Sequence, residues 1–354
     1  MDYRTVRVRV GKGYDVVIGG GLLNECGRLI AETVGNRRIA IITDTNVEKL
    51  YLEKTLSSIR DAGVDAVSFV FPAGEENKNI GTLAGILEFL AENKFTREDV
   101  VVALGGGVVG DIAGFAAAVY LRGIRYIQLP TTLLAAVDSS VGGKTAIDLA
   151  VGKNLAGAFK QPELVVCDTD TFETLPQREF SNGMAEAIKY GVLFDRELFD
   201  LFMEDMSRTL IDDVVERCVR HKGCIVEIDE LEKNERRLLN LGHTIGHAIE
   251  KCSHYGVTHG HGVSTGMAMI ARAGEALGMT EKGTAERIEA VLARYDLPID
   301  TEFDKESLVN AALSDKKRRG GSITLVIPKK IGECILHTEP VEKLSNYIEL
   351  GRKN

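Results

Sequence analysis

The stretch VVVALGGGVVGDIAGFAAAVY, residues 100–120, decides the fold of this chain. Its first five residues, Val100–Leu104, are all apolar, as in a strand that is buried on both faces. Three glycines, Gly105–Gly107, then lead toward the helical pattern Ile112–Tyr120. Glycines at a strand-to-helix turn let the backbone approach a phosphate, and the helix N-terminus attracts its charge. The stretch therefore predicts a nucleotide-binding turn, although a tight turn that merely packs closely would use the same glycines.

Further β-rich runs lie on both sides of this stretch, and helical patterns such as Lys78–Asn93 separate several of them. These runs are Thr5–Val10, Asp15–Ile18, Arg38–Thr43, Ala66–Phe71, Arg125–Leu129 and Leu164–Cys167. Strands that alternate with helices predict a mostly parallel sheet with helices on both faces. The first half of the chain is therefore expected to be a Rossmann-like domain.

Helical periodicity dominates the second half, from about residue 171 onward. The helical patterns are Arg178–Tyr190, Asp212–Ile228, Arg236–Cys252, Val263–Leu277 and Thr284–Tyr295, and two β runs follow, Ser322–Ile327 and Glu333–His337. We predict an α/β protein with a Rossmann-like nucleotide-binding domain at 1–170 and a mainly α-helical domain at 171–354. The functional groups are expected in the cleft between the two domains.

The composition argues against several classes of protein. The 354 residues carry a net charge of −9, which is unfavourable for binding nucleic acid because phosphate contacts need a basic surface. The first ten residues, MDYRTVRVRV, lack the apolar core of a signal peptide, and the run Phe115–Leu121 is too short to cross a bilayer. The six cysteines include no Cys-x-x-Cys pair. We expect a cytoplasmic protein with reduced thiols, no nucleic-acid partner and no membrane span.

Polar residues follow other strands of the predicted sheet. Asp44 comes directly after a strand, where a carboxylate suits the two hydroxyls of a ribose and disfavours a 2′-phosphate, so NAD is expected rather than NADP. As an alternative, Asp44 caps a helix. Glu75 and Lys78 follow the next strand, and Thr131-Thr132 follow a later one. These side chains offer further polar groups beside the same edge of the sheet.

Five of the seven histidines fall between residues 243 and 261. His243 and His247 are four apart and therefore share one helix face, and His259 and His261 follow after a short turn. A catalytic zinc commonly takes three protein ligands and keeps one open position. The third ligand is expected to be a carboxylate, and Glu186 is the candidate because its neighbours are small and apolar. A single histidine is more often a core or surface residue, but this concentration favours a metal site.

Some basic residues lie in glycine-rich, weakly charged segments of this acidic chain. They are Arg122, Lys144, Lys153 with Asn154, Lys189, and Arg236 with Asn240. A ring of such cations would grip a small polyanion, with arginine making paired hydrogen bonds to a carboxylate or phosphate. The segment Gly142–Thr145 ends like an ATP-binding P-loop, but Asp138 stands where that motif needs a glycine. ATP binding by that route is therefore excluded.

Several segments together match one family pattern in collinear order. They are Gly105–Gly114, Arg122–Gly123, Leu129–Ala135, Val137–Thr145, Gly152–Asn154, Gly183–Lys189, Leu239–Glu250 and Asp315–Lys317. On these segments the chain resembles the 3-dehydroquinate synthase family of the sugar-phosphate cyclase superfamily, from about residue 44 to residue 317. One departure is His261, because the family commonly has His-Gly-Glu-Ala-Val where this chain has His-Gly-His-Gly-Val. Alignment on the following Gly266-Met267 favours His259 as the family's metal ligand.

The resemblance implies a role for each matching residue. Glu186, His243 and His259 would hold the metal, normally Zn²⁺, with Co²⁺ as the alternative. Lys144, Lys189, Asn240 and His247 would line the reacting centre, with Asp138 nearby. Arg122, Lys153, Asn154, Lys222, Arg236 and one of Lys316 and Lys317, here taken as Lys316, would bind the substrate. Asp44, Glu75, Lys78, Gly106, Gly107, Asp111, Thr131 and Thr132 would contact NAD. Family members are usually homodimers.

The implied activity is a carbon–oxygen lyase reaction of the shikimate pathway, in aromatic amino acid biosynthesis. It would convert 3-deoxy-D-arabino-heptulosonate 7-phosphate into 3-dehydroquinate and phosphate by transient oxidation, elimination, re-reduction and aldol closure. One alternative is a metal-dependent polyol or glycerol-phosphate dehydrogenase, which would release NADH. Another is a different sugar-phosphate cyclase, and a third is a binding module without turnover. The number of anion-binding residues favours the 3-dehydroquinate synthase interpretation over these alternatives.

Overall fold

The computed structural model describes residues 3–314 and 321–353 and contains two compact units. The first unit comprises Met1–Leu175 and Ile211–Glu227, and the second comprises Pro176–Leu210 and Ile228–Asn354. The long helix α8 (Arg208–Ile228) therefore contributes most of its length to the first unit. A division into domains at 1–170 and 171–354 stays a prediction. Among the described residues, no helix is both long and apolar enough to span a membrane.

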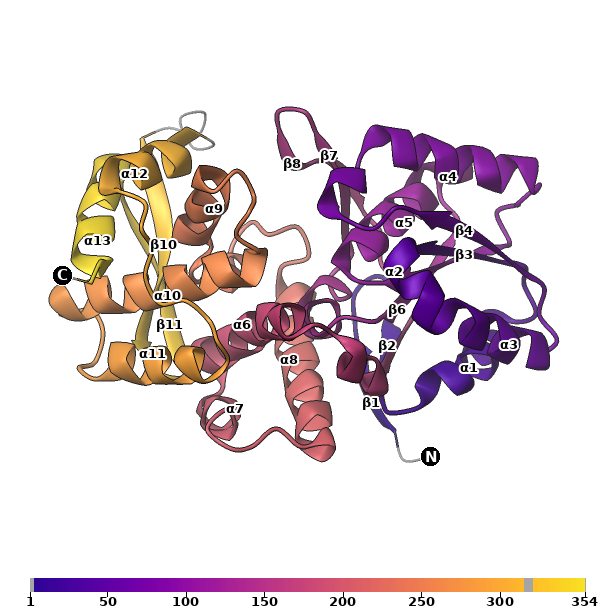
Figure 1. The fold of residues 1–354 in the computed structure, drawn as a ribbon, viewed down its shortest axis with the longest axis horizontal. Helices are drawn as coiled ribbons and strands as arrows, with labels where there is room; N and C mark the ends of the chain where they lie inside the picture. Colours follow the sequence, from indigo (N-terminus) through magenta and orange to yellow (C-terminus); the bar gives the residue numbers. More distant parts are fainter. Residues whose placement is uncertain (1–2, 315–320, 354) are drawn as a thin grey trace. The chain divides into compact units, whose positions relative to one another are not determined.

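A seven-stranded sheet forms the centre of the first unit (Figure 1). Its strands, in spatial order, are β1 (Arg4–Val8), β2 (Tyr14–Gly19), β9 (Leu164–Asp168), β6 (Arg125–Pro130), β5 (Val100–Gly105), β3 (Ile39–Asp44) and β4 (Ala66–Phe71). Every neighbouring pair is parallel except the antiparallel pair β1–β2. The predicted Rossmann-like α/β domain with a mostly parallel sheet is thus confirmed.

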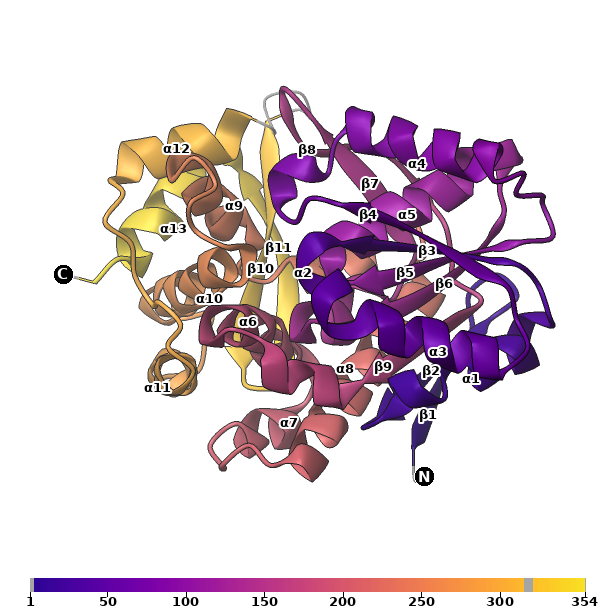
Figure 2. The same cartoon turned by 45° about the vertical axis from the view of Figure 1, so that its right-hand side comes forward.

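Helices cover both faces of this sheet, as Figure 2 shows. They are α1 (Cys26–Val34), α2 (Thr45–Val47), α3 (Glu53–Asp61), α4 (Ile80–Glu92) and α5 (Gly107–Val119). Because side chains alternate along a strand, Val100, Val102 and Leu104 pack with α1 and α3 on one face. Val101 and Ala103 pack with α4 and α5 on the other. Because β5 is buried on both faces, its sequence is a continuous apolar run.

The strand order reverses next to β3. From β3 the chain continues to β4 on one side, and β5 then pairs with β3 on its other side. In open parallel sheets, ligands bind outside the carboxyl ends of the strands at such a reversal. Here that place lies between Asp44, which ends β3, and Gly105, which ends β5.

A two-stranded hairpin was not predicted from the sequence. Its strands are β7 (Lys144–Leu149) and β8 (Gly152–Phe159), which pair antiparallel. Leu149 of β7 and Leu155 of β8 are apolar but exposed, so the sequence lacks the alternation of apolar and polar residues that normally identifies a strand.

The second unit is mainly helical and includes one hairpin (Figure 1). Its helices are α6 (Gln177–Phe194), α7 (Arg196–Leu201), α9 (His243–Cys252), α10 (His259–Ala276), α11 (Thr284–Arg294), α12 (Lys305–Ser314) and α13 (Leu344–Gly351). The strands β10 (Ser322–Lys330) and β11 (Glu333–Pro340) contain the predicted β runs. The helical C-terminal part is therefore confirmed.

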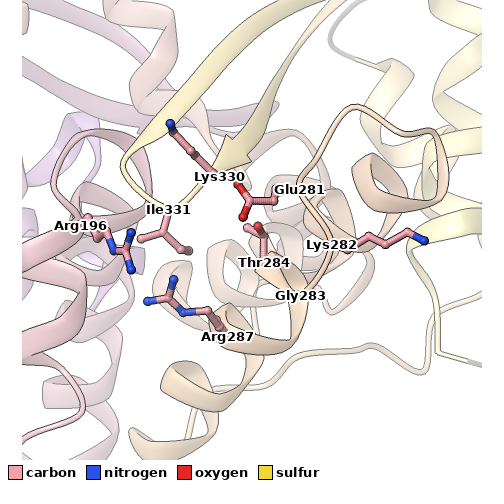
Figure 3. A pocket seen from close by; sticks show the side chains of 8 residues that line it. All are labelled: Arg196, Glu281, Lys282, Gly283, Thr284, Arg287, Lys330 and Ile331. Carbon is pink, nitrogen blue, oxygen red and sulfur yellow. The ribbon is translucent and has the colours of Figure 1, made fainter.

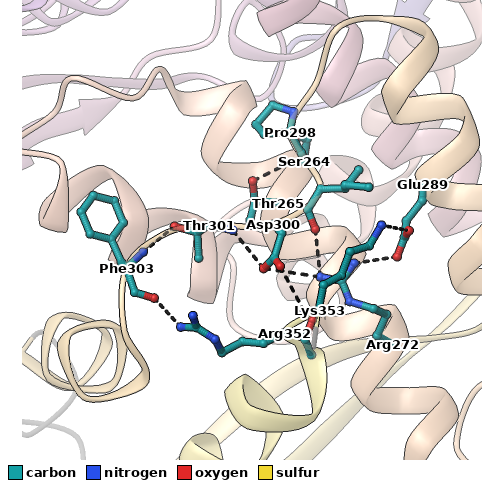
Figure 4. A network of polar contacts seen from close by, with 12 residues as sticks. Ser264, Thr265, Arg272, Glu289, Pro298, Asp300, Thr301, Phe303, Arg352 and Lys353 are labelled. Carbon is teal, nitrogen blue, oxygen red and sulfur yellow. Dashed lines mark hydrogen bonds and ion pairs between the residues drawn. The ribbon is translucent and has the colours of Figure 1, made fainter.

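A network around Arg272 fastens helix α10 to the end of the chain (Figure 4). Arg272 donates hydrogen bonds to the carbonyl oxygens of Gly351 and Ile299 and pairs with Glu289 at 2.6 Å. Lys353 pairs with the same Glu289 at 2.8 Å. This network holds α10, which carries one of the predicted metal ligands, in a fixed place within its unit.

The predicted continuous helix Arg236–Cys252 is wrong. Residues Glu235–Asn240 form a 3₁₀ turn, and α9 begins only at His243. Gly242 separates the two with φ of 78°, a left-handed conformation that glycine adopts without strain. Similarly, α10 begins at His259, four residues before the predicted start at Val263. Both predicted metal-binding histidines therefore lie at the first residue of a helix.

Candidate active site

Three predicted metal ligands converge in the second unit. Glu186 comes from the middle of α6, His243 from the start of α9 and His259 from the start of α10. One potential ligand atom from each lies within 4.8 Å of the other two. The Nε2 atoms of His243 and His259 lie 3.7 and 3.5 Å from the same oxygen, Oε1 of Glu186. Three donors that face one point are what a small cation requires.

The other nitrogen of each imidazole is already engaged. Nδ1 of His243 lies 3.0 Å from the carbonyl oxygen of Leu241, and Nδ1 of His259 lies 2.9 Å from Oε1 of Glu250. Because both partners accept hydrogen bonds, Nδ1 carries the hydrogen in the neutral rings and Nε2 carries the lone pair. Histidines that bind metal show this arrangement almost always. Two imidazoles and one carboxylate therefore fit a divalent metal such as Zn²⁺ or Co²⁺.

The charges around this cluster act differently on the two histidines. Burial, with the nearby Lys189 and the other imidazoles, holds the pKa of His243 well below its ordinary value, although Glu186 opposes the shift. Burial also disfavours the charged form of His259, but hydrogen bonds to Glu186 and Glu250 outweigh it and raise the pKa to about 10. Positive charge at this point is thus favoured by two carboxylates, and a bound cation would supply it in place of a proton.

The structure separates His259 from His261. Of these two histidines, His259 lies 3.5 Å from Glu186 and belongs to the candidate metal group, whereas Nδ1 of His261 lies 2.6 Å from Oγ1 of Thr258. Burial, with a smaller effect of Arg178, lowers the pKa of His261. His247 is exposed, and its ring centroid lies 5.4 Å from that of His243. It thus lies beside the cluster, on the same face of α9.

Glycines on α9 and α10 allow the two histidine-bearing helices to touch. A Cβ on Gly246 would lie 2.8 Å from the carbonyl carbon of Gly262, and a Cβ on Gly266 would lie 2.0 Å from the carbonyl oxygen of Gly242. Both distances are far below van der Waals contact. The helix axes can approach this closely only because these side chains are absent, and this approach brings His243 and His259 together.

Other predicted residues of this unit lie in defined surroundings. Nζ of Lys189 lies 2.5 Å from Oε2 of Glu186, and both side chains are buried. Asn240 donates a hydrogen bond of 2.8 Å to Glu232, and Arg236 is only 2% exposed. Glu232 was missed in the sequence, where a glutamate in the charged segment Asp229–Glu235 gives no signal.

In the first unit, the predicted cofactor residues follow the carboxyl ends of parallel strands. Asp44 ends β3, Gly106 and Gly107 follow β5, Thr131 and Thr132 follow β6, and Glu75 and Lys78 follow β4. No side chain caps α5, so its first backbone N–H groups are not covered by a capping residue. A Cβ on Gly106 would lie 3.0 Å from Cγ2 of Thr132, so the turn and the threonine lie close together. This arrangement fits a bound dinucleotide.

Asp44 also acts as a helix cap. Its Oδ1 accepts hydrogen bonds from the backbone N–H groups of Asn46 and Val47 at the start of α2. The capping alternative therefore describes its contacts in the structure. A ribose contact through this carboxylate remains a prediction.

A buried lysine joins residues from both predicted groups. Nζ of Lys78, which is 4% exposed, lies 2.5 Å from Asp111 and 2.6 Å from the side-chain oxygen of Asn154. Burial disfavours its charge, but Asp111 and Glu75 outweigh that effect and raise the pKa of Lys78. Lys153 pairs with the same Glu75 at 3.5 Å. Predicted NAD-binding and substrate-binding residues thus form one contiguous cluster.

The remaining predicted residues are more dispersed. Lys222 on α8 lies 2.9 Å from Oδ2 of Asp138 and donates 2.7 Å to its carbonyl oxygen. Lys144 is exposed at the start of β7, and Arg122 is exposed with φ of 68°. Lys316 and its alternative Lys317 lie outside the described residues.

A cavity of about 130 Å³ lies near the start of α11 (Figure 3). Its lining residues are Arg196, Glu281, Lys282, Gly283, Thr284, Arg287, Lys330 and Ile331. None of the predicted site residues is among them. Its cations also have acidic neighbours, because Asp200 pairs with Arg287 at 2.8 Å and Glu333 with Lys330 at 3.3 Å. We therefore do not place the active site here.

Comparison with known proteins identifies the family. Residues 68–182 match the description 3-dehydroquinate synthase N-terminal, and residues 183–318 match 3-dehydroquinate synthase C-terminal. A 3-dehydroquinate synthase of Clostridium acetobutylicum is 45% identical over 351 residues, which cover 97% of this chain and 98% of that protein.

Solved structures of two other synthases share the fold. A 2-deoxy-scyllo-inosose synthase complexed with carbaglucose-6-phosphate, NAD⁺ and Co²⁺ has a TM-score of 0.88 at 24% identity, covering 98% of this chain and 99% of that one. The 2-epi-5-epi-valiolone synthase of Streptomyces hygroscopicus subsp. jinggangensis, with NAD⁺ and Zn²⁺ bound, has a TM-score of 0.87 at 26% identity, with 97% and 96% covered. Since both family models match and the relative is 45% identical over nearly the whole chain, this chain belongs to the 3-dehydroquinate synthase family.

Proposed function

We propose that this chain converts 3-deoxy-D-arabino-heptulosonate 7-phosphate into 3-dehydroquinate and phosphate. This is a lyase reaction of the shikimate pathway, which leads to chorismate and the aromatic amino acids. The observation that carries the proposal is the convergence of Glu186, His243 and His259, in a chain whose other unit has a dinucleotide-type strand reversal. The 45% identity to a 3-dehydroquinate synthase supports this choice over other cyclases, which are 24% and 26% identical.

NAD and a divalent metal are the proposed cofactors, with the metal as Zn²⁺ and Co²⁺ as the alternative. Glu186, His243 and His259 would hold the metal. Asp44, Glu75, Lys78, Gly106, Gly107, Asp111, Thr131 and Thr132 would hold NAD. When bound, NAD would take and return a hydride, and the metal would lower the pKa of the hydroxyl that is oxidised. The NAD⁺ and Zn²⁺ in the valiolone synthase support both assignments.

The reacting centre would be formed by Lys144, Lys189, Asn240 and His247, with Asp138 nearby. Lys189 already contacts Glu186, so its ammonium group can orient both this carboxylate and a substrate oxygen. His247 is exposed beside the histidine cluster and can exchange protons with a substrate group or water. Asn240 is oriented by Glu232 and can hold a hydroxyl group.

The substrate's anionic groups would be held by a set of basic and amide side chains. These are Arg122, Lys153, Asn154, Lys222, Arg236 and Lys316. Cations that hold a phosphate both position it and stabilise the charge that grows as it leaves. Asn154 is already fixed by Lys78, which supports a role in positioning rather than proton transfer.

We further propose that the chain works as a homodimer in the cytoplasm, with an NAD-binding domain at 1–170 and a metal- and substrate-binding domain at 171–354. Family resemblance supports the dimer. Arg122 supports it further, because it is exposed on a strained turn where it could reach a second subunit.

Phosphate release tests the proposed reaction. Purified protein is given the heptulosonate phosphate, Zn²⁺ and NAD⁺ at a level that only fills the sites. We expect many equivalents of phosphate per NAD⁺ and no lasting absorbance of NADH, because the hydride returns to the substrate before product leaves. One NADH accumulating for each phosphate would instead identify a dehydrogenase. No phosphate release from this substrate, but release from another ketose phosphate, would identify a different cyclase.

A further inference from the structure

Glu250 is a buried carboxylate beside the histidine cluster for which neither the motifs nor the proposed reaction supplies a role. It lies on α9, is 5% exposed, and its Oε1 lies 2.9 Å from Nδ1 of His259. Gly262 of α10 is its neighbour, since a Cβ on Gly262 would make an ordinary contact of 3.4 Å with its Cγ. A buried carboxylate is costly unless it is paired, and the contact with His259 is one that stabilises it.

Helix geometry places Glu250 where it can act on the neighbouring helix. His243, His247 and Glu250 are spaced four and three residues apart and therefore share one face of α9. Thus α9 supplies one candidate metal ligand, His243, and also the carboxylate that contacts the ligand of α10, His259.

His259 belongs to two possible metal-binding groups, and the contact between Glu250 and His259 distinguishes them. One group is Glu186, His243 and His259, and the other is His247, Glu250 and His259. In the first group His259 faces Glu186 with Nε2, and Nδ1 is free to donate to Glu250. In the second group Glu250 would bind the metal directly. The hydrogen-bond distance between Glu250 and Nδ1, together with the exposure of His247, favours the first group.

We propose that Glu250 is a positioning residue for the metal centre. It accepts the Nδ1 hydrogen of His259, which fixes the tautomer and directs the Nε2 lone pair toward Glu186. The partner carboxylate also makes the imidazole a stronger ligand, and loss of such partners typically weakens metal binding 10- to 100-fold. This inference rests on the proposed metal centre and adds to it a residue that does not touch the metal.

Zinc affinity of the metal-free protein tests this role without any assay of activity. The zinc dissociation constant is measured by competition with a chromophoric chelator for the wild type, Glu250→Ala and Glu250→Gln. We expect binding to weaken by about 10- to 100-fold in Glu250→Ala. Glu250→Gln should lose less, because its amide oxygen can still accept from Nδ1. Wild-type affinity in Glu250→Ala would overturn the proposal.

The visible spectrum of the Co²⁺-loaded proteins separates positioning from direct ligation. Glu250→Gln should keep the wild-type cobalt bands, because the set of metal ligands is unchanged. Altered bands in this variant, or a loss of zinc affinity in His247→Ala as large as in Glu250→Ala, would make Glu250 a direct ligand and refute the proposal. If Glu250→Ala does not fold, Glu250→Gln and its spectrum decide. Failure of the wild type to bind zinc would refute the metal centre itself, and this inference with it.

Discussion

Gly246 of α9 and Gly262 of α10 meet backbone to backbone: a Cβ on Gly246 would lie 2.8 Å from the carbonyl carbon of Gly262. The contact lies between the helices that begin with His243 and His259. Since neither backbone can yield without moving its helix, the separation of these helices depends on the absence of two side chains. The absence of side chains at Gly246 and Gly262 therefore sets both the packing of the two helices and the spacing of the metal ligands that they carry.

Gly246→Ala should separate α9 from α10 and weaken both the fold and the metal site. Overpacking of this kind costs about 1–3 kcal/mol of unfolding free energy. Zinc affinity should fall as well, because His243 and His259 move apart. Chemical unfolding and a chelator competition assay measure the two effects. Gly223→Ala is the matched control, because Gly223 also lies in a helix but a Cβ there would have ordinary contacts at 3.4 Å from Val8. It should leave zinc affinity unchanged and stability equal or higher.

His243→Ala should yield a folded protein with little bound metal and little activity. The change removes one of three donors, and with it the site's ability to hold a Lewis acid. His261→Ala is the neighbouring control and should keep its metal, since the His261 ring contacts Thr258 rather than Glu186. Metal content after dialysis measures both. Loss of metal in His261→Ala but not in His259→Ala would show that the ligand assignment is wrong.

Much of the fold was readable because its signals are local. The double burial of β5 appears as a continuous apolar run at Val100–Leu104, and the turn into α5 appears as three glycines. The clustering of histidines pointed to a metal site for the same reason. These features depend on residues that are neighbours in the sequence, so the sequence pattern predicts them.

Other features depend on distant contacts and could not be read in this way. The hairpin β7–β8 exposes several of its apolar residues, such as Leu149 and Leu155, and its sequence does not alternate between polar and apolar residues, so it was missed. Gly242 breaks the predicted helix because the start of α9 packs on α10, where a Cβ on Gly242 would lie 2.5 Å from the carbonyl oxygen of Val263. Glu250 ends the family segment Leu239–Glu250, but its contact with the imidazole of His259, nine residues away, forms only when α9 packs on α10.

Lys153→Met should impair substrate use without affecting stability. The pair of Lys153 with Glu75 is partly exposed, with the two side chains 29% and 39% accessible, so its loss should cost little stability. A charge-assisted bond to a substrate anion is worth about 1.5–3 kcal/mol, so kcat/KM should fall at least about tenfold. The affinity for NAD should change little. Lys49→Met, at an exposed lysine outside the proposed site, should behave as wild type. Unchanged kinetics in Lys153→Met would remove this residue from the substrate site.

The free energy of unfolding at acid pH should depend on Asp229. This buried carboxylate accepts hydrogen bonds from the backbone N–H groups of Lys233, Asn234 and Arg236 at 2.9, 2.6 and 3.2 Å. Burial alone would raise the pKa of Asp229, but these bonds and the charge of Arg236 lower it. Because the folded-state pKa is the lower one, the stabilisation is complete above the unfolded pKa of about 3.9 and is lost as pH falls through the folded value.

Asp229→Asn tests this dependence, because an amide cannot be protonated in this range. The variant should be less stable than wild type at pH 7, and the difference should shrink as the pH is lowered from about 5 to about 3. Urea unfolding at a series of pH values measures it. A difference that stays constant over this range would show that the carboxylate charge does not stabilise the loop that leads to Arg236.

Lys78 and Asp111 should stabilise the fold as a pair. The ammonium group lies 2.5 Å from Asp111 and 2.6 Å from Asn154, and its side chain is only 5% accessible. Lys78→Met leaves the carboxylate of Asp111, whose side chain is 20% accessible, without its ammonium partner. The loss should cost about 1–3 kcal/mol of unfolding free energy. Asp111→Asn should also destabilise, since it leaves the ammonium group uncompensated. The double variant should lose clearly less than the sum of the two single changes, because each change removes what makes the other costly.

Arg60→Met is the control, since Arg60 and its partner Glu53 are both largely exposed, and this change should alter the free energy of unfolding by no more than about 0.5 kcal/mol. Urea unfolding of the four proteins of the cycle measures the coupling. Strictly additive losses would mean that the Lys78–Asp111 pair does not stabilise the fold.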